Sequence, residues 1–208
     1  QAEKRSAEIF DTKTQRFKPT GVSAMDRVSN TATLLPDGRV LIAGGAIKEG
    51  RRWKVLSSAE LYDPQKGTFV LTGSMTMVRY KHGAILLPDS TVLIVGGSDE
   101  RDWQGQYNTA EFYDTKHGTF SRLEDMKGKR FKLPNGISLL NDGTALISGG
   151  SNQVEVYNPR RKVFSSVATF REPHFFATAT LLPDGSVLIT GGYNTQPQST
   201  DEAYVYKQ

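Results

Sequence analysis

Four side chains that can carry a positive charge recur at one position of the sequence. Each lies seven residues before a Leu-Leu pair, and they are Arg27, Arg79, Lys132 and His174. His82 follows Arg79 by three residues, and Arg171 precedes His174 by three. Guanidinium, ammonium and imidazolium groups donate charge-assisted hydrogen bonds to carboxylates and phosphates. We therefore predict that these six residues form a ligand-binding rim. In the alternative interpretation, the guanidinium groups bond carbonyl groups of neighbouring loops.

Aromatic side chains mark a second candidate surface. The two tryptophans of the chain, Trp53 and Trp103, stand in matching segments (46–57 and 98–108), each flanked by charged residues, and Tyr107 follows in the second segment. Rigid aromatic side chains serve as stacking platforms in binding surfaces. These three loop aromatics therefore predict contact with a sugar or a protein side chain. The alternative is that each tryptophan covers an edge of its own sheet.

The residues required for most known catalytic centres are missing or wrongly spaced. The chain has no cysteine, three histidines, and no metal-ligand spacing, nucleophile elbow or phosphate loop. We therefore predict no catalytic residue, no metal and no cofactor. One glutamate recurs at matching positions (Glu8, Glu60, Glu111 and Glu155). A buried carboxylate requires a partner, so we predict a structural role with backbone donors or an arginine of the adjacent unit.

Composition limits the classes of partner. The 208 residues include 26 basic and 22 acidic ones, a mild excess that does not predict nucleic-acid binding. The basic runs 51–54 and 159–162 fall on opposite faces of the predicted fold, so they form no continuous stripe. No apolar run is long enough to span a bilayer. We therefore predict neither a nucleic-acid partner nor a membrane span.

An internal repeat of about fifty residues must position these side chains. The segment Leu34–Gly45 returns at 86–97, 139–150 and 181–192, and each copy holds a two-residue turn signal such as Asp37-Gly38 between apolar runs. That signal is typical of a tight hairpin. A second phrase, Ala59-Glu60-Leu61-Tyr62-Asp63, also recurs, and an aromatic residue follows its last position by six. The repeat therefore predicts four antiparallel strands per unit, which we name a, b, c and d.

The paired glycines after strand b and the aromatic spacing resemble the kelch repeat over nearly the whole chain. The sequence of Leu34–Gly45 is similar to sequences of bacterial kelch proteins and of the propeller domain in the galactose oxidase and glyoxal oxidase group. The resemblance implies a β-propeller that is secreted, periplasmic or at the cell surface. The copper site of galactose oxidase requires a tyrosine–cysteine crosslink, which this chain cannot form. Two departures from the family pattern are Phe for Trp in strand d and Ser90 at a turn glycine.

The repeat predicts a single all-β kelch-type domain over 1–208, with about four blades of four antiparallel strands that starts and ends in mid-blade. The predicted units are a half-blade at 1–25, blades at 26–77, 78–126 and 127–170, and a partial blade at 171–208. An open arc would expose apolar faces. We expect completion by another chain or further sequence, self-association of two copies, or closure as a compact four-blade ring with strand d of the half-blade completing the last blade.

The functional prediction from sequence is a non-catalytic binding scaffold that presents loops to a protein or glycan ligand. The alternative is a carbohydrate-active kelch enzyme, similar either to sialic acid mutarotases or to a galactose oxidase-like domain without copper. An enzyme would place a carboxylate or histidine within hydrogen-bond reach of the arginine rim in one concave pocket. A binding module would present a broader loop surface.

Overall fold

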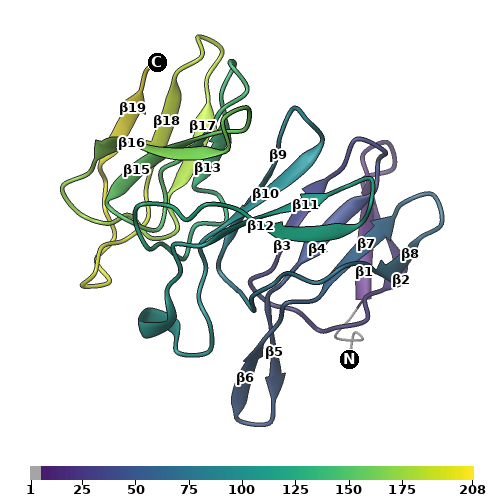
Figure 1. Cartoon of the computed structure of the whole chain (residues 1–208). Coiled ribbons are helices and arrows are strands. Elements are labelled where there is room, and N and C mark those ends of the chain that lie inside the picture. Colours follow the sequence, from purple (N-terminus) through teal and green to yellow (C-terminus); the bar gives the residue numbers. More distant parts are fainter. Residues whose placement is uncertain (1–5) are drawn as a thin grey trace.

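The computed structural model describes residues 6–208 and shows an all-β chain. Small antiparallel sheets stand side by side as the blades of a β-propeller, with the N-terminal and C-terminal sheets at opposite ends of an arc (Figure 1). The sheets contain two, four, four, four and three strands in chain order. The predicted all-β propeller, with a start and an end in mid-blade, is therefore confirmed for the described residues, whereas the kelch type stays a prediction.

The strands of each blade follow the predicted order from inside to outside. The N-terminal sheet contains β1 (Ser6–Asp11) and β2 (Arg16–Val22). The first full blade contains β3 (Thr31–Leu34), β4 (Val40–Ala43), β7 (Ala59–Asp63) and β8 (Thr68–Leu71). The second contains β9 (Gly83–Leu86), β10 (Thr91–Val95), β11 (Ala110–Asp114) and β12 (Thr119–Arg122). The third contains β13 (Ile137–Leu139), β14 (Ala145–Ile147), β15 (Gln153–Asn158) and β16 (Val163–Thr169). The last contains β17 (Thr178–Leu181), β18 (Val187–Thr190) and β19 (Ala203–Tyr206).

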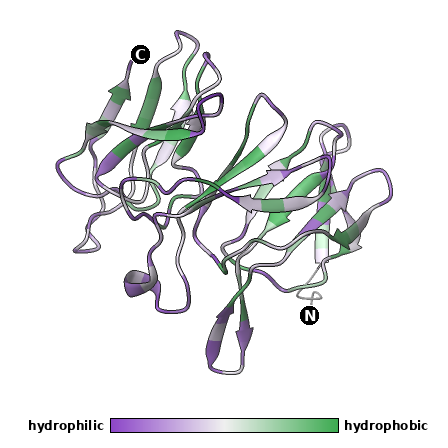
Figure 2. Cartoon of the chain, in the orientation of Figure 1, coloured by the Kyte–Doolittle hydropathy of each residue, from purple (hydrophilic) through white to green (hydrophobic). Residues whose placement is uncertain are grey.

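Two of the loops between strands b and c have structure of their own. The first forms a projecting hairpin of β5 (Ala46–Glu49) and β6 (Arg52–Val55), and the second contains the 3₁₀ helix η1 (Asp102–Gly105) (Figure 1). Neither the hairpin nor the 3₁₀ helix was predicted for the segments 46–57 and 98–108. Figure 2 shows these projections as mainly hydrophilic, whereas the strands of the blades carry most of the hydrophobic residues.

The core lies between successive blades, where their apolar faces meet. Strand b is apolar at consecutive positions because both of its faces are covered, as in β10. Val92 and Ile94 pack against the first blade, whereas Leu93 and Val95 pack against the third. The repeated aromatic of strand d packs on the tyrosine of strand c, with ring centroids 4.7 Å apart in the pair Tyr113 and Phe120. The spacing of six residues between the end of the strand c phrase and the next aromatic residue therefore indicates that the rings of strands c and d form a pair.

Backbone hydrogen bonds connect successive blades at the loops that lead into their innermost strands. Lys81 N donates to Ser29 O (3.0 Å), Lys132 N to Lys81 O (2.7 Å) and Phe176 N to Lys132 O (2.6 Å). All four residues have a positive φ between 54° and 58°. This left-handed conformation is unfavourable for side chains with a Cβ, so the surrounding loops must fix it.

The end sheets leave apolar side chains in solvent. Phe17 in the first sheet, Leu34 in the first full blade and Val205 in the last sheet are all more than half exposed. Strand β2 pairs with β1, and the last sheet keeps three strands. The predicted closure in which strand d of the half-blade completes the last blade is therefore wrong for this structure. Completion by another chain or by two copies stays a prediction. No helix in residues 6–208 is long and apolar enough to cross a membrane.

Candidate functional site

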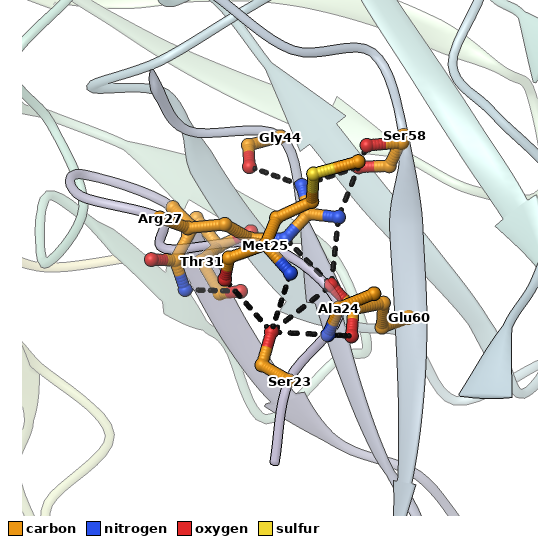
Figure 3. Close-up of polar contacts among 9 residues, drawn as sticks. Ser23, Ala24, Met25, Arg27, Thr31, Gly44, Ser58 and Glu60 are labelled. Atoms are coloured by element: carbon orange, nitrogen blue, oxygen red, sulfur yellow. Dashed lines mark hydrogen bonds and ion pairs between the residues drawn. The ribbon is translucent and has the colours of Figure 1, made fainter. Parts of the chain in front are cut away.

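The arginine of the first full blade lies in an internal ion pair. Arg27 Nη2 is 2.8 Å from Glu60 Oε1, and its Nη1 donates to the carbonyl groups of Gly44 and Ser58 (Figure 3). The other carboxylate oxygen of Glu60 accepts a backbone hydrogen bond from Ala24 at 2.7 Å. Both charged side chains are almost completely buried. The pair joins the loop before β3 to strand β7 of the same blade.

The next two blades repeat this arrangement. Arg79 Nη2 is 2.7 Å from Glu111 Oε1, and Arg130 Nη2 is 2.7 Å from Glu155 Oε1. Burial lowers the pKa of both guanidinium groups, and the neighbouring carboxylates oppose that shift. The structural role predicted for the recurring glutamate is confirmed at these positions. The arginine comes from the same blade, however, and not from the adjacent one. Glu8 is exposed.

The third arginine shows that Lys132 was assigned to the wrong position in the repeat. The closing glycine of one blade donates to the carbonyl of this repeat position in the next, and its acceptors are Arg79, Arg130 and His174. Arg130 lies nine residues before Leu139 instead of seven, because a turn over 133–136 precedes β13. Lys132 is instead equivalent to Lys81. The shared pattern Arg79-Tyr80-Lys81 and Arg130-Phe131-Lys132 was the signal in the sequence that would have given the correct alignment.

The residues of the predicted rim are thus divided between internal contacts of the first two full blades and two further clusters, whose members Lys132 and His174 are also largely buried. Arg79 and His82 have no exposed surface, and Arg27 is used within its own blade. His82 Nε2 lies 3.0 Å from Thr31 Oγ1 of the preceding blade. These three side chains cannot contact a ligand in this conformation, so the prediction of a ring of free donors is corrected for them. Lys132, His174 and Arg171 lie elsewhere.

Lys132 lies in an aromatic–lysine cluster, which we define as Trp103, Phe131, Lys132, Phe175 and Tyr193. The Lys132 ammonium is 4.2 Å from the centroid of the Trp103 ring and 4.7 Å from that of Phe131, and it donates to Tyr193 Oη at 2.7 Å. The indole meets Phe131 and Phe175 edge-on, with centroids 4.9 and 4.8 Å apart. Three blades therefore contribute to one cluster, and Trp103 keeps 39% of its surface exposed.

A second lysine fixes the loop that carries Trp103. Lys81 Nζ is 2.7 Å from Asp102 Oδ1, which also accepts a hydrogen bond from Tyr80 Oη at 2.8 Å. Hydrogen bonds from Lys81 and Tyr80 keep the pKa of Asp102 below its usual value although burial opposes this shift. Burial raises the pKa of Tyr80 well above its usual value. A charged Lys81–Asp102 pair thus holds η1 against the loop before β9.

The other predicted aromatics lie apart from this cluster. Trp53 is 49% exposed on the β5–β6 hairpin, where it lines a cleft of about 540 Å³ with Glu49, Arg52, Lys54 and Glu100. Glu100 belongs to the next loop and accepts a hydrogen bond from Val55 N at 2.9 Å. Tyr107 is partly buried, with its ring 5.6 Å from the Arg79 guanidinium. Tyr107 therefore has a packing contact, whereas Trp53 is open to solvent.

His174 and Arg171 line a polar cleft of about 180 Å³ in the last blade. The loop 194–202 forms its opposite wall, and the cleft also includes Glu172, Pro173, Asn194, Gln198, Ser199, Thr200, Asp201 and Glu202. His174 Nε2 faces Glu202 Oε2 at 3.8 Å, and Tyr204 Oη donates to the same oxygen at 2.6 Å. We call this the last-blade cleft. The Glu202 carboxylate was not identified from the sequence, because residues 203–206 match the recurring strand c sequence only weakly.

A hollow of about 690 Å³ lies on the opposite face and is lined by turns between strands a and b and between c and d. Its two carboxylates, Asp89 and Asp142, are used inside their own turns. Asp89 accepts hydrogen bonds from Thr91 N and Oγ1, and Asp142 accepts them from Thr144 N and Oγ1. Within residues 6–208, no three His, Asp or Glu side chains converge to hold a metal ion. No family model and no curated protein matches the sequence.

Proposed function

We propose that this chain is a non-catalytic binding scaffold that holds a protein or glycan ligand on the aromatic–lysine cluster. Propeller folds commonly mediate binding, and here the blades supply a rigid base for loops that differ in length and content. The cluster lies on the face formed by the loops after strands b and d. The turns between strands a and b, by contrast, are short and alike.

The observation that supports this proposal is the fixed and partly exposed indole of Trp103. Edge contacts from Phe131 and Phe175 and the ammonium of Lys132 determine its orientation. Phe176, 44% exposed, adds a second aromatic surface through Tyr193, with ring centroids 6.1 Å apart. An aromatic group held in this way loses little conformational entropy on binding, which is the property of an interface anchor.

The test is a binding screen followed by substitution on both faces. Immobilised glycans and peptides are screened with the chain, and each ligand found is titrated against Trp103→Ala. We expect the affinity to fall about tenfold or more, the range for loss of an aromatic anchor. Arg39→Ala, on the a–b turn face, is the matched control and should leave the affinity unchanged. Ligands that bind Trp103→Ala as tightly as the unaltered chain would refute the proposal.

The alternative function, a carbohydrate-active enzyme, has one feature in its favour. The last-blade cleft brings His174, Glu202 and Arg171 together. However, the imidazole and the carboxylate are 3.8 Å apart, beyond hydrogen-bond length, and Arg171 donates a hydrogen bond to neither within the described chain. An enzyme of this class would change the rate of anomer interconversion or of bond cleavage in a sugar. Proton NMR of reducing sugars with and without the chain measures that rate.

We also infer that the blades are of the kelch type and that the protein is secreted, periplasmic or at the cell surface. The paired glycines after strand b support the first inference, since both adopt positive φ in the blades that hold Gly44-Gly45 and Gly96-Gly97. A Cβ on Gly44 would meet the carbonyl oxygen of Arg79 from the next blade. Cell fractionation followed by immunodetection tests the location.

A further inference from the structure

The last-blade cleft contains a buried imidazole with an unused nitrogen. His174 is 3% exposed, and its Nε2 has no hydrogen-bond partner among the described residues. Its ring is held by edge-on contacts with Phe170 and Tyr204, whose centroids lie 5.0 and 5.4 Å away. A buried polar atom without a partner is costly, so this nitrogen indicates a missing ligand group.

The other ring nitrogen determines what Nε2 can do. His174 Nδ1 lies 3.4 Å from the carbonyl oxygen of Gly191. A carbonyl oxygen only accepts hydrogen bonds, so the favourable neutral form carries its proton on Nδ1. Nε2 is then an acceptor, and it faces Glu202 Oε2, which is also an acceptor. In this tautomer, two acceptors face each other across 3.8 Å, and a ligand group with at least two hydrogen-bond donors would satisfy both.

The charges that line the cleft indicate which kind of ligand group can donate these hydrogen bonds. Its walls carry three carboxylates, Glu172, Asp201 and Glu202, against the single guanidinium of Arg171. Asn194 Nδ2 donates to Glu172 Oε2 at 2.8 Å and so partly satisfies one of them. A cation is favoured by this excess of negative charge. A metal ion does not fit, because no three ligating side chains converge within residues 6–208.

The last blade differs from the others at the two positions that create this cleft. In the three preceding blades, the position of His174 holds an arginine that pairs with the glutamate of strand c. In the last blade, Tyr204 pairs with Ile189 in the register that Glu60 has with Ile42. Tyr204 therefore replaces the glutamate, and the shorter His174 replaces the arginine. The rings of Phe170 and Tyr204 pack on His174 in place of the ion pair, and His174 Nε2 borders the cleft without a hydrogen-bond partner among residues 6–208.

We propose that the last-blade cleft binds the primary ammonium group of a ligand, with His174 Nε2 and Glu202 as its acceptors. An ammonium group has three donors, enough to satisfy both acceptors. The cleft volume of about 180 Å³ is below that of sites for drug-sized ligands, so it suits a small group rather than a whole chain. Two sources present such a group, an amino sugar and the side chain of lysine in a peptide.

Calorimetric titration at neutral pH tests the proposal. The probes are glucosamine, N-acetylglucosamine, and lysine amide acetylated on its α-nitrogen. We expect glucosamine or the lysine derivative to bind, and whichever binds more tightly identifies the source. N-acetylglucosamine, which lacks the charge, should not bind. Binding of N-acetylglucosamine as tight as that of glucosamine, or binding of none of the three probes, would overturn the proposal.

Substitutions identify the atoms involved. Glu202→Gln should weaken ammonium binding by about ten- to a hundredfold, because it removes one charge-assisted hydrogen bond. The Glu202 side chain is 48% exposed, so this variant should keep its unfolding temperature. Glu124→Gln changes an exposed carboxylate of another blade and is the matched control.

The double variant His174→Arg with Tyr204→Glu recreates the ion pair of the other blades and should abolish binding while remaining folded. Unchanged affinity in Glu202→Gln would refute the assignment. Failure of this test leaves the proposed function intact, because that function is measured through Trp103 with other ligands.

Discussion

Acidification should destabilise the fold through His82, because this imidazole is buried in its neutral form. It lies between the closing glycines of two blades, where a Cβ on Gly44 or on Gly97 would meet it. Its Nδ1 has no hydrogen-bond partner among the described residues. Burial first, and then the charge of Arg79, lower the pKa of His82 to about 3. A histidine in an unfolded chain has a pKa of about 6.5.

The difference between these two pKa values sets the size of the effect. The unfolded chain takes up a proton at this residue as the pH falls below about 6.5, whereas the folded chain does not do so until about pH 3. The contribution of neutral His82 to the free energy of unfolding is therefore fully present above about pH 6.5. It is lost progressively as the pH falls toward about 3. At about 1.4 kcal/mol per pKa unit, the loss at about pH 4 is roughly 3 kcal/mol. Typical domains have only about 5–15 kcal/mol of stability.

Urea unfolding followed by tryptophan fluorescence measures this loss. The chain is compared with His82→Asn over a pH range from about 7 to about 4, since Asn30 is the equivalent residue in the first blade. The variant should be less stable at neutral pH, and the difference should shrink by about 1.4 kcal/mol per pH unit on acidification. Ser121→Asn, which introduces the same residue at an exposed position without an ionisable group, is the control and should keep the slope of the unaltered chain. Parallel pH profiles for the chain and His82→Asn would refute the reasoning.

Substitutions elsewhere in the scaffold test its backbone and its ion pairs. Ser90→Gly should stabilise the chain by about 1 kcal/mol in urea unfolding, because Ser90 has φ 67° at a turn position where Gly38 has φ 85°. An unchanged midpoint would mean that Ser90 is not strained. Arg79→Met should destabilise by about 3–5 kcal/mol because it leaves Glu111 buried without its counter-charge, and adding Glu111→Leu should recover most of that loss. Equal stability of the single and double variants would show that the uncompensated charge is not the cause.

The repeat made most of the fold predictable from sequence. Asp37-Gly38 and the corresponding turns of the other repeats indicate hairpins. The constant spacing from Asp63 to Phe69 indicates a pair of aromatic rings on neighbouring strands. These local patterns were enough to place the strands. The same patterns carried no information on the β5–β6 hairpin. Apart from one bridge between Ala46 and Val28, its strands pair with each other, and its outer residues are exposed. Hydrophobic periodicity reports burial, so a strand pair without a buried face gives a weak signal.

The candidate sites were less predictable because they depend on distances between blades. Counting back from the Leu-Leu pair assigned Lys132 to the arginine position, since the turn before β13 adds two residues that periodicity cannot detect. The aromatic–lysine cluster joins Trp103 to Phe131 and Phe175 from two further blades. No spacing within one repeat encodes that contact. It depends on how successive blades are placed, and backbone hydrogen bonds such as that from Lys132 N to Lys81 O join them there.

One position of the repeat has two different roles in this chain, and that difference bears on where a ligand binds. The position is occupied by Arg27, Arg79, Arg130 and His174. In three blades, an arginine at this position satisfies a buried glutamate and several carbonyl groups, as Arg79 does with Glu111. Such a pair joins the incoming loop to strand c and leaves the guanidinium group buried, so it serves the scaffold. In the last blade, His174 occupies the position and no carboxylate lies opposite it in strand c. The loop there is held instead by ring contacts, and the adjoining cleft is lined by polar groups, among which the buried His174 Nε2 has no hydrogen-bond partner in residues 6–208. A repeat protein can therefore gain a binding site by losing a structural ion pair in a single blade, since the remaining blades keep the fold stable.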